Sequence, residues 1–297
     1  MTDFLQLLVA GVAVGALYAL VALGFVVIYK ATGVINFAQG ALLLLGAYLT
    51  YTFRDQLEWP FWVAVLLAVV GCALVGVLIE RVILRRMVGR PVFAVIMITI
   101  GLTIAIEQVV TWRWPGQRNL SDPFALDTVT FGEVVVPVVN LWRIGTAAVL
   151  LAGFFLFFRY SRVGVAMRAT ASDQEAALAQ GISARRVFAL SWAIAAAIAA
   201  LAGALLASGG RGLDPSLGVV ALVAFPAIIL GGLDSPAGAV VGGIVMGVVE
   251  TMTAGYSDRL PEWLGANFHR VTPYVVLVAI LLVRPYGLFG TREVTRV

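Results

Sequence analysis

The stretch FLQLLVAGVAVGALYALVALGFVVIY, residues Phe4 to Tyr29, carries no charged side chain. A helix that crosses the hydrocarbon core of a bilayer needs about 20 mostly apolar residues. The stretch is too long for the apolar part of a secretory signal, and Asp3 precedes it where such a signal carries Lys or Arg. We therefore expect a membrane-spanning helix that is retained in the mature protein.

The rest of the chain has the same character. Hydrophobic residues make up 61% of it and charged residues 12%, with a mean hydropathy of +1.00, and a soluble domain carries about twice that share of charge. Eight further apolar segments are expected over Phe37–Phe53, Phe61–Leu84, Val92–Val110, Leu141–Phe158, Val187–Ala207, Leu217–Leu230, Ala237–Ala254 and Val271–Val283. The predicted fold is all-α, a single domain over residues 1–297 forming a polytopic transmembrane helical bundle of about eight or nine membrane segments, some short or broken.

One of the apolar segments contains residues that interrupt a helix. Leu217–Leu230 contains Pro226 and runs into Gly231 and Gly232, a pattern typical of a broken or re-entrant helix. Such a segment is tolerated only where protein or a water-filled cavity covers the freed backbone.

Basic residues predict the orientation. If the N-terminus lies outside and all nine segments cross, 13 of the 20 Lys and Arg residues fall on the cytoplasmic side, among them the clusters Arg81–Arg90 and Arg159–Arg186. Lys30, Arg284, Arg292 and Arg296 also lie on that side, and Arg211 is one of the outer residues. The positive-inside rule then predicts an outer N-terminus and a cytoplasmic C-terminus.

Two loops are longer than a simple connection between two spans requires. The outer loop at 112–140 is rich in Trp and Pro and contains a β-prone stretch, Glu133–Val136; it is either a docking surface for a soluble partner or an ordered turn. The cytoplasmic loop at 159–186 contains Ser172-Asp173-Gln174-Glu175, which has the spacing of a capping box.

The capping box predicts a short helix over Asp173–Gln180. Gly181 fits the left-handed position that ends such a helix, and Ser183 can cap the helix that follows. Ala176, Ala177 and Ala179 would give this helix a small-residue surface that another protein can approach closely. A docking helix and a plain interfacial connection both fit these residues.

Polar residues recur inside two apolar segments. Thr99, Thr103 and Glu107 follow one another at intervals of four, which predicts a polar stripe facing the bundle interior or a water-filled path. Asn36 and Gln39 share a face at the start of the second segment and suit the same pathway, since amides bind a zwitterion without a fixed charge. The alternatives are bonds within the helices for the threonines, an interfacial position near Arg113 for Glu107, and helix–helix hydrogen bonds or turn formation for the amides.

Small residues predict close helix packing. Gly238-xxx-Gly242 and Gly243-xxx-Gly247 allow two backbones to approach, as does Gly11-xxx-Gly15 in the first segment. Glu250 follows Gly247 by three residues, so it lies on the same seam. Packing is the favoured role for Glu250, with a substrate or gating role as the alternative.

The sequence lacks the residues for chemistry of its own. The single lysine, Lys30, follows Tyr29, so a phosphate-binding loop of the form GxxxxGK[ST] is excluded. One histidine, His269, and one cysteine, Cys72, exclude an HExxH zinc site and a thiolate cluster. We expect no enzymatic activity, no metal, no bound cofactor and no nucleic-acid partner, with ATP bound by a partner subunit if ATP drives the protein.

Several motifs resemble one known family. Glu175-Ala176-Ala177 followed by Gly181 is similar to the EAA loop that seats a coupling helix of importer permeases in an ATPase of the ATP-binding-cassette (ABC) class. The segments Gly33–Gly40, Thr99–Leu102, Ser161–Ala169, Phe225–Glu250 and Arg284–Gly290 resemble the branched-chain amino-acid permease family of the LivH type, in the same order along the chain. Gln39, Ala41 and Asp234 depart from residues common in the family, and the first two departures leave branched-chain amino acids, urea and short-chain amides open as substrates.

The resemblance implies a transport subunit of an importer in the bacterial cytoplasmic (inner) membrane. Its implied partners are two ATP-binding subunits, a second permease of the LivM type, an extracytoplasmic solute-binding protein, the bilayer and a small solute. Asp173, Glu175, Ala176, Ala177 and Gly181 would couple the chain to the ATPase, whose cycle would drive alternating access. An ion-coupled secondary transporter or a channel is the alternative, since such proteins also use broken helices at the membrane midplane.

Overall fold

The computed structural model describes residues 2–87, 89–124, 127–210, 212–259, 261, 267–284 and 287–290. Arg211, Arg292 and Arg296 of the charge prediction, and Pro285-Tyr286 of the C-terminal motif, lie outside these residues.

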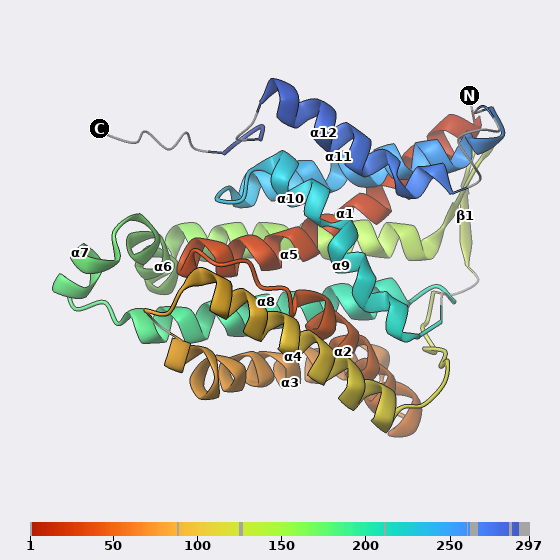
Figure 1. Ribbon diagram of the computed structural model, residues 1–297. Helices are drawn as coiled ribbons and strands as arrows, with labels where there is room; N and C mark the ends of the chain where they lie inside the picture. Colours follow the sequence, from red (N-terminus) through yellow and green to blue (C-terminus); the bar gives the residue numbers. More distant parts are fainter. Residues whose placement is uncertain are drawn as a thin grey trace.

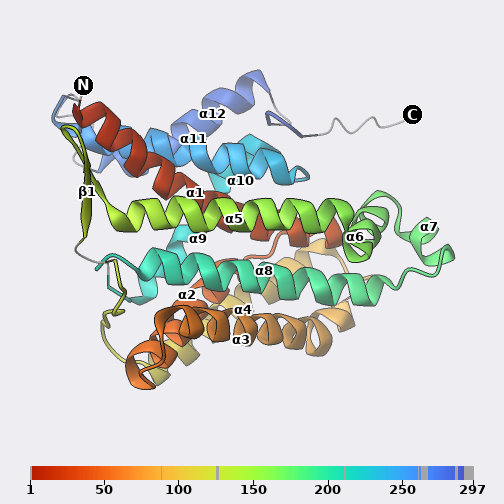
Figure 2. The same cartoon turned by 180° about the vertical axis from the view of Figure 1, so that it is seen from behind.

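The chain folds as a bundle of roughly aligned helices (Figures 1 and 2). Six of them are long and apolar enough to cross a membrane: α1 (Thr2–Thr32), α3 (Phe61–Val82), α4 (Val92–Arg113), α5 (Val138–Tyr160), α8 (Ala184–Ala207) and α11 (Pro236–Gly255). Two shorter apolar stretches, Pro215–Gly231 and Phe268–Val283, run beside them. The predicted polytopic helical bundle with short and broken segments is confirmed.

The two ends of the bundle differ. At one end, here called the hairpin end, β1 (Thr128–Phe131) pairs antiparallel with β2 (Val134–Pro137), so the β-prone stretch of the outer loop forms half of a hairpin. At the other, here called the α7 end, α6 (Arg162–Ser172) and α7 (Gln174–Ala179) project beyond the long helices (Figure 1). The N-terminus lies at the hairpin end, while the described residues near the C-terminus point the opposite way.

Helix α1 forms the core of the bundle. Its apolar residues are almost all buried because α5, α8 and α11 pack around it. In contrast, α4 lies at the edge, and large side chains such as Phe93 and Trp112 remain exposed along it (Figure 1). Exposed apolar residues of this kind have lipid or another subunit as their natural environment.

The second apolar segment is a half-helix. The chain leaves α1 at Thr32, runs without helix over residues 33–38, and enters α2 (Gln39–Tyr51) deep inside the bundle. Gln39 is fully buried, and its side-chain amide donates to the carbonyl of Ala195 (3.2 Å), halfway along α8. From there α2 and the π-helical turn Thr52–Gln56 lead to the hairpin end, so the predicted start at Phe37 falls two residues early.

The predicted break in the seventh segment is present. A 3₁₀ turn (Pro215–Val219), α9 (Val220–Val223) and α10 (Phe225–Gly231) follow one another, with Pro226 in the first turn of α10. The segment starts where Leu213 pairs with Arg118 of the loop 112–140 in an isolated β-bridge. It ends beside Asp234, whose carbonyl accepts from Lys30 at the far end of α1 (3.2 Å). It therefore runs from one end of the bundle to the other and is not re-entrant.

The remaining described elements are the 3₁₀ turns Leu84–Met87, Ser257–Arg259 and Phe268–Arg270, which lie between helices, and α12 (Thr272–Val283), which forms the last predicted apolar segment. The amides of Leu288 and Phe289 donate to the carbonyls of Leu230 and Gly231 (2.7 and 3.2 Å), which attaches the chain after α12 to the end of α10.

The loop 159–186 corrects one prediction. The sequence analysis missed α6, which begins at Arg162 after the cap Ser161 and includes Ser172 as its last residue. Because Ser172 is helical, its hydroxyl donates to the carbonyl of Arg168 (3.1 Å) and is not available to cap α7. Asp173 is the cap instead, accepting from the amide of Ala176 (2.9 Å), so α7 starts one residue later than predicted and the Ser172–Glu175 capping box does not form.

Candidate functional site

The predicted amide pair lies at the point where α2 begins. Asn36 and Gln39 are both buried, and the side-chain oxygen of Asn36 accepts from the backbone amide of Ala38 (3.0 Å). The side-chain nitrogen of Asn36 lies 3.5 Å from the side-chain oxygen of Gln39. Both amide side chains therefore stabilise the start of α2, which lies inside the bundle.

The threonines of α4 meet the same point. The backbone amide of Phe37 donates to the hydroxyl of Thr99 (3.3 Å), and the hydroxyl of Thr103 donates to the carbonyl of Phe37 (3.1 Å). Two groups that the sequence presented separately, Asn36 with Gln39 and Thr99 with Thr103, thus form one polar cluster around residue 37. This central cluster ties the edge helix α4 to the interior of the bundle.

Glu107 continues the stripe toward the hairpin end. It is half-buried, and its Oε1 lies 3.4 Å from the position that a Cβ on Gly218 would occupy. Gly218 belongs to the broken segment and also contacts Gly40 of α2. Glu107 therefore faces the two interrupted segments, while Arg113 stacks over Trp114 at 5.3 Å.

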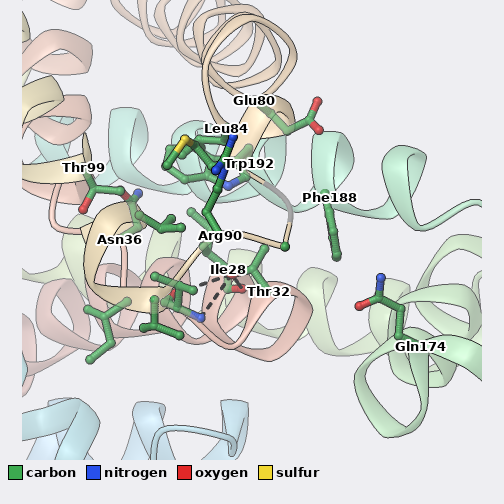
Figure 3. A pocket seen from close by; sticks show the side chains of 16 residues that line it. Ile28, Thr32, Asn36, Glu80, Leu84, Arg90, Thr99, Gln174, Phe188 and Trp192 are labelled. Carbon is green, nitrogen blue, oxygen red and sulfur yellow. Dashed lines mark hydrogen bonds between the residues drawn. The ribbon is translucent and has the colours of Figure 1, made fainter. Parts of the chain in front are cut away.

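A cavity of about 210 Å³ lies between the central cluster and the α7 end. Figure 3 shows Asn36 and Thr99 at one side of it and Phe188 and Gln174 at the other, with Arg90 and Trp192 between them. Its walls are mostly aliphatic and aromatic side chains from α1, α4, α8, the non-helical residues 33–38 and the connection between α3 and α4. A mostly apolar pocket with a few convergent polar groups is the usual form of a small-molecule site.

The sequence analysis missed the charged residues of this cavity. Glu80, near the end of α3, is buried at 2% exposure and forms an ion pair with Arg85 (2.8 Å). Arg90 lines the cavity from the connection between α3 and α4. The available signal was a carboxylate inside an apolar segment followed five residues later by an arginine, since ionisable residues within spans pair with one another.

Helix α7 presents the predicted coupling residues at the tip of the molecule. Gly181 follows it with φ +80°, and the amides of Gly181 and Ile182 donate to the carbonyls of Leu178 and Ala177 (2.9 and 3.0 Å). This is the Schellman ending that glycine favours. Asp173, Glu175 and Ala176 are exposed, as is Leu178, whereas Ala177 is buried rather than on the predicted surface.

The four predicted packing glycines of α11 face two different helices. Cβ atoms added to Gly243 and Gly247 would lie 2.4 and 2.2 Å from the backbone nitrogens of Ala19 and Gly15 in α1. Cβ atoms on Gly238 and Gly242 would instead lie 2.0 and 2.1 Å from the carbonyl oxygens of Gly231 and Ala227 in α10. Helix α11 thus connects the core helix to the broken segment through two close backbone contacts.

Glu250 lies on the first of these seams. It accepts a hydrogen bond of 2.6 Å from the hydroxyl of Tyr18 in α1. The bond gives an intramembrane carboxylate a partner on the neighbouring helix, which is the usual arrangement for such a group.

The groups of the central cluster and of the cavity have the chemistry of a binding site for a small solute. Within the described residues, no three His, Cys, Asp or Glu side chains lie close enough together to hold a metal ion. Amides, hydroxyls and charged groups next to apolar walls suit a small solute with polar and apolar ends.

Comparison with known proteins identifies the family. The model of the family described as branched-chain amino acid transport system / permease component matches residues 7–282. The high-affinity branched-chain amino acid transport system permease protein LivH of Escherichia coli (strain K12) is 32% identical over 99% of this chain and 98% of its own length. The corresponding permease protein BraD of Pseudomonas aeruginosa is 30% identical over the same shares of both chains.

A solved structure shares the fold. A chain of PsaBC from Streptococcus pneumoniae, in complex with Fab, superposes with a TM-score of 0.53 at 13% identity, covering 96% of this chain and 93% of that one. The chain thus belongs to the family of permease components of branched-chain amino acid transport systems, membrane subunits of ABC transporters that are not themselves enzymes and whose ATP is hydrolysed by a partner ATPase.

Proposed function

We propose that this chain is one of two permeases of an importer that carries branched-chain amino acids across a bacterial cytoplasmic membrane. Two ATP-binding subunits would attach at the α7 end, and an extracytoplasmic solute-binding protein would deliver the solute at the hairpin end. A second permease, of LivM type or a second copy of this chain, would cover the exposed side of α4. The relatives LivH and BraD, which are permeases of branched-chain amino acid transport systems, support branched-chain amino acids over urea or amides.

The shape of α7 is the observation that carries this proposal. It is a short helix fixed at both ends, by the Asp173 cap and the Schellman ending at Gly181, and it projects beyond the spans (Figure 2). A six-residue helix is not stable alone, so fixed ends indicate that its exact placement matters. Its exposed Ala176, Leu178 and Ala179 form a small apolar surface that suits a groove of an ATPase.

Charge supports the orientation. At the α7 end, arginines are clustered in and next to α6 and in the connection between α3 and α4, whereas the arginines at the hairpin end are scattered. By the positive-inside rule, the α7 end would be cytoplasmic and the N-terminus outside.

The central cluster and the cavity are the proposed pathway. Asn36, Gln39, Thr99 and Thr103 would form its constriction, Glu107 would lie on the outer side, and the cavity would be open to the cytoplasm in this conformation. Alternating access would then require the Phe37 region to move relative to α4.

The coupling assignment is tested by co-purification and uptake. Glu175→Lys and Gly181→Val should reduce both ATP-driven leucine uptake and recovery of the ATPase subunits with this chain, while the chain stays in the membrane. Glu133→Lys makes the same charge change in the exposed hairpin turn and should retain the ATPase. Normal ATPase recovery and uptake with both α7 variants would refute the assignment, and ion-driven transport by this chain alone in proteoliposomes would support a secondary transporter.

A further inference from the structure

Two residues of opposite charge, Glu80 and Arg90, line the cavity, whose other walls are mostly apolar. Glu80 is buried, and its carboxylate accepts hydrogen bonds from Nε and Nη2 of Arg85 (3.3 and 2.8 Å). Arg90 is exposed and also lines the cavity, and its guanidinium has no hydrogen bond or ion pair within the described part of the chain. With Glu80 neutralised by Arg85, the charge left at the cavity is that of Arg90.

An unpaired guanidinium at an apolar cavity has a preferred ligand. Its planar donors match a carboxylate in a two-bond geometry, and charge-assisted bonds of this kind are among the strongest available to a protein. The aliphatic walls formed by Ile28, Val34 and Val95, with the indole of Trp192, leave space for a small branched side chain. Glu80 keeps acceptor sites that two bonds from Arg85 do not fill, so it can also accept from an ammonium group.

We propose that this cavity binds the transported amino acid from the α7 end, with Arg90 holding its carboxylate and its apolar side chain lying against Val95 and Trp192. The inference rests on the proposed function and assigns a specificity role to a residue outside the motifs of the sequence analysis. Its consequence is selectivity: a solute without a carboxylate loses its main polar contact, so leucine is bound better than leucinamide or urea.

Cysteine protection tests this directly, because Cys72 is the only cysteine in the chain and is buried. In a Cys72→Ala background, Val95→Cys places a thiol on the cavity wall of the complete transporter purified with its partner subunits. Thr32→Cys on another wall serves as a second reporter. A maleimide reagent then measures how far each solute slows labelling.

We expect leucine and 4-methylpentanoate to protect both reporters and leucinamide and urea to protect neither. Arg90→Gln should raise the leucine concentration for half-protection roughly tenfold to a hundredfold, the loss expected for one charge-assisted contact. Arg86→Gln is the matched control, since Arg86 is exposed, lies four residues away and does not line the cavity.

Equal shifts with Arg90→Gln and Arg86→Gln, or protection by leucinamide as strong as by leucine, would overturn the assignment. ATP-driven leucine uptake by the same Cys72→Ala complex separates the two proposals. Uptake without leucine protection refutes the cavity site alone, whereas protection without uptake refutes the importer function and leaves the site standing.

Discussion

The hydroxyl of Thr103 donates to the carbonyl of Phe37 at 3.1 Å, although 66 residues separate them in the sequence. Thr99, one turn away, accepts from the amide of the same residue (3.3 Å). A non-helical backbone inside a membrane needs such partners, because lipid offers none. The threonines of α4 therefore satisfy the backbone groups of Phe37 in the non-helical stretch before α2. This stretch in turn gives α4, at the edge of the bundle, its polar contact.

Replacing these hydroxyls should weaken the contact between α4 and α2. Thr99→Val and Thr103→Val keep the shape of the side chain, and each should lower the free energy of unfolding by about 0.6 kcal/mol, typical of a hydrogen bond between membrane helices. Thr111→Val is the control, since that exposed hydroxyl donates only to its own helix at Glu107. Denaturation of the protein in mixed micelles measures the difference, and equal losses for all three variants would contradict the assignment.

The glycine seam between α1 and α11 should not tolerate a side chain. A Cβ at Gly247 would lie 2.2 and 2.3 Å from backbone atoms of Gly15, so Gly247→Val forces the two helices apart. We expect a loss of several kcal/mol, as for severe overpacking of a core, and reduced recovery of folded protein by gel filtration. Gly153→Val should be well tolerated, because a Cβ there meets nothing within 4 Å.

The Tyr18–Glu250 bond should be measurable as a coupling energy. Tyr18→Phe and Glu250→Gln, made separately and together, form a double-mutant cycle across α1 and α11. We expect a coupling of about 0.6–1.7 kcal/mol, the range found for hydrogen bonds between membrane helices. A coupling near zero, with transport lost only in Glu250→Gln, would support the alternative substrate or gating role.

Removing one partner of the Glu80–Arg85 pair should cost more than removing the charges of both. Arg85→Ala leaves a carboxylate with 2% exposure without its cation, which should destabilise the protein by about 1.5–3 kcal/mol. The double variant Glu80→Gln/Arg85→Ala should recover part of that loss, because a neutral amide is less costly to bury. Thermal unfolding of the two variants side by side gives the answer, and a double variant no more stable than Arg85→Ala would contradict the prediction.

The corrected start of α7 predicts which residue stabilises it. Asp173→Ala removes the side chain that accepts from Ala176 and should cost about 1 kcal/mol of local stability. Ser172→Ala, which the capping-box prediction would have made equally harmful, should cost less because Ser172 only bonds back within α6. Amide hydrogen exchange of Ala176 and Ala177 reports this local opening, and the reverse order of effects would restore the original prediction.

In the sequence, hydropathy determined the membrane bundle, and proline and glycine determined the break around Pro226 and the left-handed residue Gly181. These features are local: lipid requires long apolar helices, and proline and glycine change the backbone wherever they stand. Helix α6 was missed because the first helix of the loop was expected to begin at the Ser172–Glu175 pattern, and the cap of α7 shifted by one residue because Ser172 was already part of α6.

Only the tertiary structure decided what the first apolar segment packs against and where the chain runs after it. Phe4–Tyr29 specified a span, but not that it would be the buried core, nor that the chain would leave it to start α2 halfway across the bundle. The meeting of Asn36 with Thr99, and of Glu80 and Arg90 at one cavity, depends on side chains from helices distant in sequence. Periodicity shows which face of a helix is polar, whereas the partner of that face is set by how the helices pack.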